Sequence, residues 1–264
     1  MRVAVIIPAA GASARFRTDD PTRSKLDEDL GGKPVLQRTV ELFNTRDDVG
    51  TIIVAAPASD DAFAAFSLRH SDKLSLFGVQ ICRGGAKHRY ESVAKALALV
   101  SDDHTHVAIH DAARPAASET LIDRVFDAAA RHPAVIPGIP LDDTLKRAGD
   151  PITESPDADP IAAILGASTG NQHLRPVLET CDRTGLVAVQ TPQVFELALL
   201  RRAYAQNDLS STDDASLVEK LGQRVLIVAG ERRNIKITRP EDVHIIRSIL
   251  GLRGPDTRAT HKRF

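Results

Sequence analysis

Short apolar runs recur along the first half of the chain and alternate with segments of helical periodicity. The first run, Val3 to Ile7, is unbroken and β-branched, which is typical of a strand buried on both faces of a parallel sheet. The same pattern predicts strands at residues 51–56, 79–82, 106–109 and 134–137. Helices are predicted between them, over residues 35–43, 60–69, 89–100 and 121–131. This alternation predicts βαβ units and an α/β fold with a mainly parallel sheet flanked by helices.

The periodic pattern is interrupted in the second half of the chain. From about residue 142 to residue 189, Pro, Gly, Asp, Ser and Thr are frequent and periodicity is weak. We interpret this segment as an excursion within one domain of residues 1–264, with a loop at 149–160 and a short strand at 186–189. Regular patterns then predict helices over 194–204, 213–221 and 240–250, a strand at 225–228 and an edge strand at 235–237. A basic tail follows at 253–264.

Composition narrows the classes of function. A net charge of −1 gives no bulk electrostatic case for nucleic-acid binding, and 4% aromatic residues without Trp argue against base-stacking platforms. Two cysteines cannot by themselves form a disulfide framework or a four-ligand zinc site. Apolar runs stay well below the length of a membrane span, and the first residues do not have a signal-peptide layout. We therefore expect a cytoplasmic enzyme with no nucleic-acid and no membrane partner.

The loop after the first predicted strand has the features of an anion site. Pro8 is followed by small residues up to Ala14, which let a backbone approach a ligand closely, and bare N–H groups at such a turn bind anions. Arg15 and Lys25 add two cations in or near this loop. The loop lacks the three glycines of the dinucleotide fingerprint and the Gly-Lys-Ser/Thr of a P-loop. A nucleotide site and an ordinary strand-to-helix turn are both consistent with it.

Further polar clusters fall where other predicted strands end. They are Gly84-Gly85, His110 to Pro115 and Asp142 to Lys146. Because ligands of open α/β sheets bind beyond the carboxyl ends of the strands, the placement shared by the loop after the first strand, Gly84-Gly85 and His110 to Pro115 strengthens each of these three. In isolation, Asp142 to Lys146 is interpreted as a polar turn. Asp111 could hold Mg²⁺, which prefers hard oxygen ligands, or it could form an ion pair or turn cap with Arg114. The second half of the chain adds four loop candidates, each of which, taken singly, is interpreted as a solvated or capping residue: Arg183, Thr191, Thr212 and Lys236.

Seven motifs occur in one order along nearly the whole chain, and together they resemble the 2-C-methyl-D-erythritol 4-phosphate cytidylyltransferase family. This family uses CTP in the non-mevalonate isoprenoid pathway. The motifs are Pro8-Ala-Ala-Gly11 with Arg15 and Lys25, Gly84-Gly85 with Ser92-Val93, His110-Asp-Ala-Ala-Arg-Pro115, Asp143-Thr144-x-Lys146, Gln190-Thr-Pro-Gln193-x-Phe195, Thr212-Asp213 and Asn234-Ile-Lys-Ile-Thr238. The resemblance implies a Rossmann-like nucleotidyltransferase fold with a protruding arm that forms a homodimer.

The resemblance also implies roles for individual residues. The backbone of Ala9, Ala10 and Gly11 would line the cytidine, Gly85 and Ser92 would hold the base, and Arg15 and Lys25 would grip the triphosphate. Asp111 would bind Mg²⁺ or another divalent cation. The residues implied to receive methylerythritol phosphate are Asp111, Arg114, Thr144, Arg183, Thr191, Thr212 and Lys236. Thr144 and Arg183 would reach the neighbouring subunit's site, and Arg15, Lys25, Asp111 and Lys236 would form the catalytic set.

The implied reaction transfers CMP from CTP to methylerythritol phosphate and releases pyrophosphate. Two alternatives remain: a sister cytidylyltransferase acting on another polyol phosphate, such as ribitol 5-phosphate, and a non-catalytic nucleotide-binding protein with the same fold. Retention of Arg15, Lys25, Asp111 and Lys236 together disfavours the second. The chain departs from the family pattern at Ser13, where a second glycine is usual, and in segment 149–179, which is longer than the usual arm.

Overall fold

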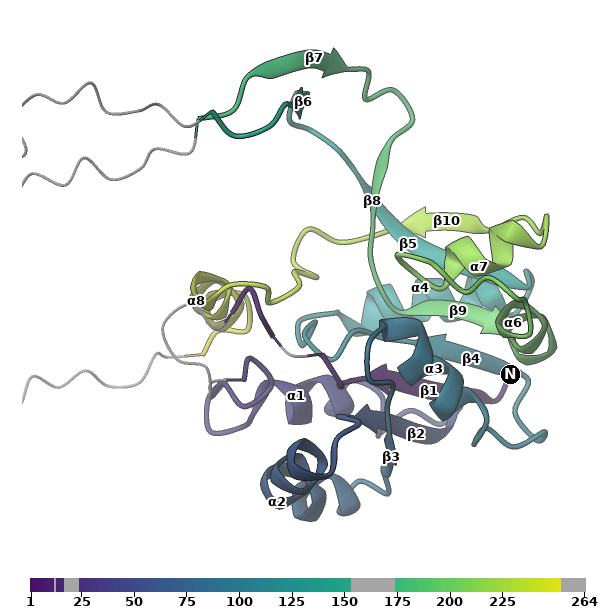
Figure 1. The fold of residues 1–264 in the computed structure, drawn as a ribbon. Coiled ribbons are helices and arrows are strands. Elements are labelled where there is room, and N and C mark those ends of the chain that lie inside the picture. The colour runs from purple at the N-terminus through teal and green to yellow at the C-terminus, as the bar shows by residue number, and fades with distance from the viewer. Residues whose placement is uncertain (12, 17–23, 153–173, 253–264) are drawn as a thin grey trace, which may run out of the picture. The chain divides into compact units, whose positions relative to one another are not determined.

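The computed structural model describes residues 1–11, 13–16, 24–152 and 174–252 (Figure 1). The chain divides into two compact units, one formed by Met1–Ile139 with the chain from Val189 onward, the other by Pro140–Ala188. This boundary lies within a few residues of the predicted excursion at 142–189. The basic tail and most of the loop predicted at 149–160 lie outside the described residues. The single-domain organisation of residues 1–264 stays a prediction.

A central sheet organises the first unit. Its neighbouring strands follow the order β10-β5-β9-β4-β1-β2-β3, and β8 pairs with β5. The strands are β1 (Val3–Pro8), β2 (Val49–Ala56), β3 (Gln80–Arg83), β4 (His106–Ile109), β5 (Ala134–Pro140), β8 (Val187–Val189), β9 (Gln193–Glu196) and β10 (Leu226–Ala229). β9 runs antiparallel to β4 and β5, whereas β1 is parallel to β2 and β4, and β2 to β3. The predicted α/β class with a mainly parallel sheet is confirmed.

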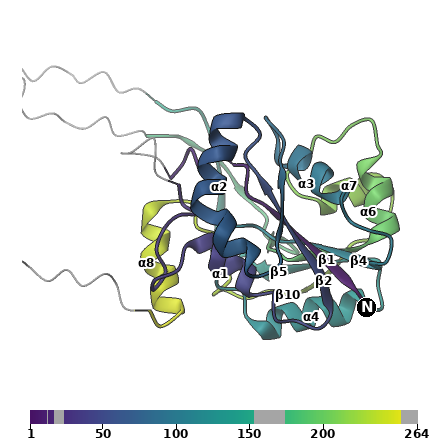
Figure 2. The same cartoon turned by 90° about the horizontal axis from the view of Figure 1, so that it is seen from below.

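Helices cover both faces of this sheet (Figures 1 and 2). One face carries α1 (Val35–Glu41), α2 (Asp60–Ser75), α4 (Glu119–Ala129) and α8 (Pro240–Ile249), and the other carries α3 (Arg89–Leu97), α6 (Leu197–Tyr204) and α7 (Ala215–Lys220). None of the described helices is long and apolar enough to cross a membrane.

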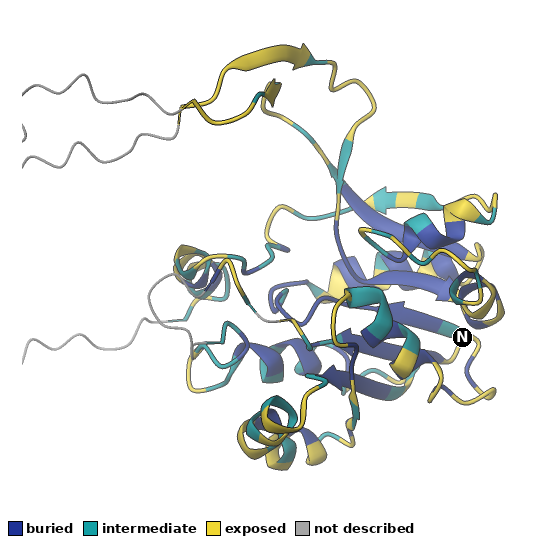
Figure 3. Ribbon diagram, in the orientation of Figure 1, coloured by how far each residue is buried: buried dark blue, intermediate teal, exposed yellow. Residues whose placement is uncertain are grey.

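β1 contributes side chains to both hydrophobic cores, and Figure 3 shows this strand coloured as buried. Val3, Val5 and Ile7 pack into the core under α1 and α4, while Ala4 and Ile6 pack into the core under α3. Successive side chains of a strand point to opposite faces, so a strand covered on both faces needs an apolar residue at every position. This requirement explains the unbroken apolar run in the sequence.

The structure corrects two predictions about local elements in the first unit. The helix predicted over 194–204 begins only at Leu197, because residues 193–196 form β9 between β4 and β5. Val194 and Phe195 are fully buried there, and a short apolar run does not by itself distinguish a buried strand from a buried helix. Residues 235–237 form no strand. Ile237 instead donates its backbone N–H to the carbonyl of Ala113, which ties this loop to the segment after β4.

The second unit contains an antiparallel pair of strands that the sequence analysis missed. β6 (Leu145–Ala148) pairs with β7 (Val177–Cys181), with Leu145 opposite Cys181. Val177 and Leu178 are 62% and 63% exposed, so the pair has no buried face along β7. Without a buried face, a strand does not need the alternation of apolar and polar residues on which strand prediction depends.

The buried face of α1 provides a test of the first core. Leu36 is fully buried, whereas Leu68 on α2 is 89% exposed. We expect Leu36→Ala to lower the free energy of unfolding by about 2–5 kcal/mol, because it removes buried methyl groups and leaves a cavity. The matched control Leu68→Ala should change it by no more than about 0.5 kcal/mol. Urea unfolding measures both, and equal losses would contradict the core assignment.

Candidate active site

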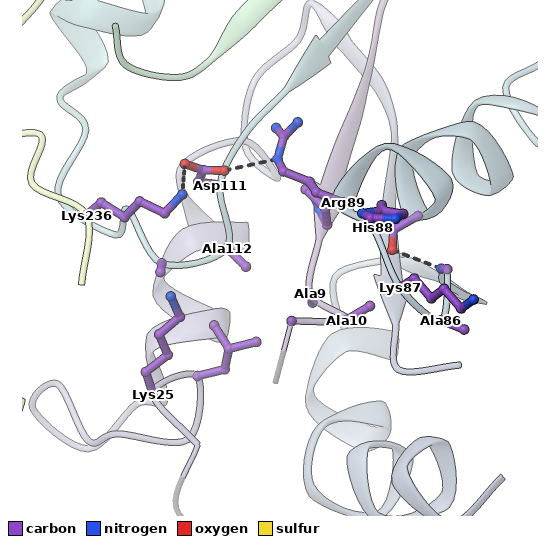
Figure 4. Close-up of a pocket in the computed structure, with 16 residues that line it drawn as sticks. Ala9, Ala10, Lys25, Ala86, Lys87, His88, Arg89, Asp111, Ala112 and Lys236 are labelled. Atoms are coloured by element: carbon purple, nitrogen blue, oxygen red, sulfur yellow. Dashed lines mark hydrogen bonds and ion pairs between the residues drawn. The ribbon is translucent and has the colours of Figure 1, made fainter. Parts of the chain in front are cut away.

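The carboxyl ends of β1, β3 and β4 surround a cavity of about 280 Å³ in the first unit (Figure 4). Its walls are formed by Pro8–Gly11 after β1, by Gly85–Arg89 after β3 and by Asp111–Ala113 after β4, with Lys25 and Lys236. This is the edge at which open α/β sheets bind ligands. The structure therefore brings together the clusters predicted after the first, third and fourth strands, whereas Asp142 to Lys146 belongs to the second unit and is not part of the cavity wall.

Close packing explains the small residues in two of these walls. A Cβ atom on Gly84 would lie 2.7 Å from the carbonyl oxygen of Ala56 and 2.9 Å from the Cβ of Ala10. A Cβ atom on Gly85 would lie 2.1 Å from the Cβ of Glu91. The backbone N–H of Gly85 donates to Ser92 Oγ over 2.9 Å. Ser92 thus orients the backbone of Gly85 at the cavity, and both positions need glycine because neighbouring protein atoms leave no room for a Cβ atom.

Asp111 is the charged centre of the site. Its Oδ2 lies 2.8 Å from Lys236 Nζ and 3.4 Å from Arg114 Nε, and its Oδ1 lies 3.5 Å from Arg89 Nε. Burial by itself raises the pKa of this carboxyl, but the charges of Lys236, Arg89 and Arg114 outweigh burial and hold the pKa well below its usual range. Asp111 is therefore ionised at neutral pH, although the residue is only 8% exposed.

A buried chain of hydrogen bonds fixes the loop that carries Asp111. Burial lowers the pKa of His110 to about 4, so the imidazole is neutral. His110 Nε2 lies 3.0 Å from the carbonyl of Arg114, which assigns the proton to Nε2 and leaves Nδ1 to accept from the Thr191 hydroxyl at 3.2 Å. Thr191 Oγ1 in turn accepts the backbone N–H of Asp111 over 3.1 Å. The turn from His110 to Arg114 is thereby anchored to the segment before β9.

Lys25 enters the cavity from a segment well apart from the other cations in sequence. Its Nζ donates to the carbonyl of Ile237 over 3.0 Å. Burial and the neighbouring charge of Lys236 lower the pKa of Lys25 to about 8, with a further contribution from Arg15. Arg15 is exposed and acts on Lys25 electrostatically, but it is not part of the cavity wall in the described structure. A partly neutral amine beside other cations is poised to regain its charge when an anion binds.

Ser13 shows why a glycine is usual at its position in the family. Its φ is +54°, in the left-handed region that glycine adopts without steric cost. The Ser13 hydroxyl oxygen is buried without a hydrogen-bond partner in the described structure. The departure noted in the sequence therefore places a non-glycine residue in a conformation that costs free energy.

The remaining predicted substrate residues are placed in different surroundings. Arg114 is partly buried, and its Nη1 donates to the carbonyl of Asn234 over 2.6 Å. Thr191 is buried and Thr212 is exposed on the loop before α7. Thr144 and Arg183 are exposed residues of the second unit. None of these five belongs to the described cavity wall, and their contacts with substrate stay predictions.

Arg89 is a site residue that the sequence analysis missed. It was interpreted only as the start of a helix, yet its side chain lines the cavity beside Asp111 (Figure 4). Its Nη1 lies 2.6 Å from Oδ2 of Asp214, a carboxylate that is 1% exposed. The available signal was its position, because an arginine at a helix start just after two strand-end glycines points to the ligand edge of the sheet. Nothing in the sequence around Arg89 indicates that it pairs with Asp214.

A doubly wound sheet with a cationic, backbone-lined cavity at its carboxyl edge is the architecture of a nucleotidyltransferase. Residues 3–166 and 160–252 match the family model for 2-C-methyl-D-erythritol 4-phosphate cytidylyltransferase, and the chain belongs to that family. A protein of this name from Frankia casuarinae is 41% identical over 94% of this chain and 81% of its own length. One from Solibacter usitatus is 35% identical, with 95% and 96% covered.

A solved structure agrees with the assignment. The crystal structure of 2-C-methyl-D-erythritol 4-phosphate cytidylyltransferase from Thermus thermophilus has a TM-score of 0.66 to this chain and 30% sequence identity. The likeness covers 96% of this chain and 100% of that one. The resemblance that the motifs indicated is therefore confirmed at the level of family and fold.

The lowered pKa of Lys25 generates a test by pH. The free protein loses the positive charge of Lys25 as pH rises through about 8, so kcat/KM for CTP should fall above that pH. In Lys25→Arg the guanidinium keeps its charge, and this decline should disappear whatever the absolute rate. Lys25→Ala should lower turnover by about 10²–10³-fold. Steady-state kinetics against pH measure all three, and an unchanged decline in Lys25→Arg would assign the titration to another group.

Proposed function

We propose that this chain transfers CMP from CTP to 2-C-methyl-D-erythritol 4-phosphate and releases pyrophosphate, a step in isoprenoid precursor synthesis. The observation that carries the proposal is the convergence of Lys25, Lys236 and Arg89 on one cavity that small residues line after β1. Cations of that density suit a triphosphate and a second phosphate. The family membership names the reaction class.

The nucleotide would occupy the walls formed after β1 and β3. Ala9, Ala10, Gly11 and Gly85 offer backbone groups and little side-chain bulk, which suits a pyrimidine in a cavity of about 280 Å³. Ser92 would act on the base through the backbone of Gly85, which it holds. Lys25 in the wall and Arg15 beside it would receive the triphosphate.

The chemistry requires little covalent help from the protein. A phosphomonoester is largely a dianion at neutral pH, so its oxygen can attack the α-phosphorus without a protein base. The protein must align the two phosphates and neutralise the charge that grows on the phosphoryl oxygens. Lys25 and Lys236 are the side chains placed for neutralisation. Arg114, Thr191 and Thr212 would position the sugar phosphate, Thr191 through its hold on Asp111.

Asp111 fits a magnesium site of the kind that completes its coordination with substrate. No group of three or more His, Cys, Asp or Glu side chains within the described part of the chain could hold a metal alone. Mg²⁺ commonly takes one carboxylate together with phosphate oxygens and waters, and Oδ1 of Asp111 is engaged only at 3.5 Å. When bound, Mg²⁺ or another divalent cation would supply charge neutralisation at the phosphates. Asp111 is the protein ligand we propose.

The second unit supports a proposed homodimer. β7 exposes Val177 and Leu178, and the chain exposes Leu186 at 46% nearby in sequence. Apolar side chains of this kind are stabilised by burial against another surface, and a second copy of the chain is the simplest one. Arg183 and Thr144 of this unit would then reach the neighbouring subunit's sugar phosphate. A guanidinium matches a phosphate bidentately, which favours Arg183 for that contact.

The proposed substrates complete the assignment. CTP and methylerythritol phosphate would be its small-molecule partners, and we propose a cytoplasmic location for the protein. The non-catalytic alternative is disfavoured because Lys25, Asp111 and Lys236 are brought to one cavity rather than left apart. No observation favours ribitol 5-phosphate as the acceptor, and the assay described next includes it as a competing substrate.

The substrate panel is the direct test. Purified protein with CTP and methylerythritol phosphate should release pyrophosphate, while ATP and GTP should be poor substitutes because the family is named for cytidylyl transfer. Ribitol 5-phosphate should be a poor acceptor, and excess chelator should abolish release. Coupled detection of pyrophosphate measures every arm. Preference for ribitol 5-phosphate, equal use of ATP, or full activity in chelator would each contradict the corresponding part of the proposal.

Subunit complementation tests the proposed shared site. Arg183→Ala should raise the KM for methylerythritol phosphate and leave the KM for CTP nearly unchanged, because it removes only a contact to the sugar's phosphate. Mixed dimers of Arg183→Ala and Lys25→Ala subunits should regain activity, since one of their two sites has both residues. Co-expression with two affinity tags isolates these dimers. Activity no higher than that of either parent would mean that Arg183 does not serve the partner's site.

A further inference from the structure

Arg89 belongs to a part-buried network that joins three helices on one side of the sheet. Its Nη1 lies 2.6 Å from Asp214 Oδ2, and the hydroxyl of Tyr204 donates to Asp214 Oδ1 over 2.5 Å. Arg89 begins α3, Tyr204 ends α6, and Asp214 directly precedes α7. Each oxygen of the buried carboxylate therefore has one partner. Of the three side chains, Arg89 is the one that lines the described cavity wall.

Arg89 faces two carboxylates at unequal distances. Asp214 holds it at 2.6 Å, whereas Asp111 Oδ1 is 3.5 Å from its Nε. An arginine without Asp214 would be free to close on Asp111, because two parallel N–H···O bonds are the strongest geometry for that pair. Such closure would engage Oδ1, the oxygen of Asp111 that Lys236 and Arg114 do not contact. The guanidinium thus lies closer to Asp214 than to Asp111.

We infer that Asp214 and Tyr204 are positioning residues that hold Arg89 at the cavity wall and keep Oδ1 of Asp111 available to the substrates. The inference deepens the proposed function and rests on it. The charge of Asp214 supplies the restraint, and the Tyr204 hydroxyl fixes the direction of that charge. Burial and Asp214 together raise the pKa of the Tyr204 phenol, so Tyr204 stays a donor at working pH.

The same network reaches the loop of a second predicted substrate residue. Asp213, next to Asp214, accepts from Gln193 Nε2 over 2.9 Å, and the N–H of Ala215 donates to Gln193 Oε1 over 3.2 Å. Thr212 comes immediately before Asp213. The anchor that restrains Arg89 therefore also lies in the short segment that presents Thr212, so the two substrate-side features share one support.

A double-mutant cycle tests whether Asp214 acts through Arg89. Asp214→Asn should lower kcat/KM by about 10–100-fold, as expected for losing a charged hydrogen bond, and Tyr204→Phe by about 3–10-fold. In an Arg89→Gln background, Asp214→Asn should cost less than about twofold, because the residue it restrains is gone. An equal cost in both backgrounds would overturn the inference. If Asp214→Asn does not fold, the same cycle with Tyr204→Phe decides it.

Two further measurements separate this inference from a structural role and from the proposed function. Asp102→Asn removes the partner of Arg201, an exposed residue of α6, and should leave kinetics unchanged. Thermal melting reports the folding of every variant. Calorimetric titration with CTP repeats the cycle on binding alone. If the wild-type protein transfers no CMP but the effects of the two substitutions on CTP binding are still non-additive, the proposed function is rejected and the positioning role of Asp214 is retained. If the wild-type protein transfers CMP but the effects of the substitutions are additive both in kcat/KM and in CTP binding, only the positioning role is rejected.

Discussion

The site depends on a carboxylate kept ionised inside the protein. Asp111 has little exposure, and an unpaired charge there would cost several kcal/mol, an order of magnitude comparable with the stability of a whole domain. Lys236, Arg89 and Arg114 make its charge tolerable. In return, the negative charge of Asp111 offsets the mutual repulsion of these cations, so that they can lie close together at the cavity of about 280 Å³. The cavity can then offer a high positive charge to phosphates without that charge destabilising the fold.

The sheet topology explains how distant segments deliver these groups. β1, β4 and β3 end at the same edge, so the loops after them meet although they lie far apart in sequence. The antiparallel β9 enters beside β4 and brings Thr191 to the backbone of Asp111. The segment before α8 returns to the same edge, where Ile237 bonds to Ala113 and accepts from Lys25. One strand order therefore sets the positions of the carboxylate and of its cations together.

Crowding of like charges also tunes the chemistry. Lys25 is buried next to Lys236, and its pKa falls to about 8 because the charged amine is desolvated and repelled. The proposed triphosphate would outweigh both effects by placing negative charge beside the amine. Binding of the nucleotide and protonation of Lys25 are therefore linked, and the site reaches its full positive charge only when it is occupied. The surroundings are preorganised for phosphate rather than for water.

Much of the fold could be predicted from the sequence because burial leaves a local signature. Three features are explained by constraints from nearby residues: the apolar run of β1, the small residues after it and the glycines after β3. The motifs around Asp111 and Lys236 indicated the family for the same reason. β9 and β6–β7 escaped prediction, one because a short buried run fits two elements and the other because an exposed ribbon has no buried face.

What only the tertiary structure decided are the pairings across the chain. Nothing near Arg89 in sequence indicates that it lies between Asp111 and Asp214, residues contributed by β4's loop and by the start of α7. Likewise, Thr191 is buried against His110, and burial and charge repulsion lower the pKa of Lys25, because folding brings these neighbours together. Periodicity records whether a residue is buried, but electrostatics depends on which charges lie within a few ångströms, and that distance is set by the fold.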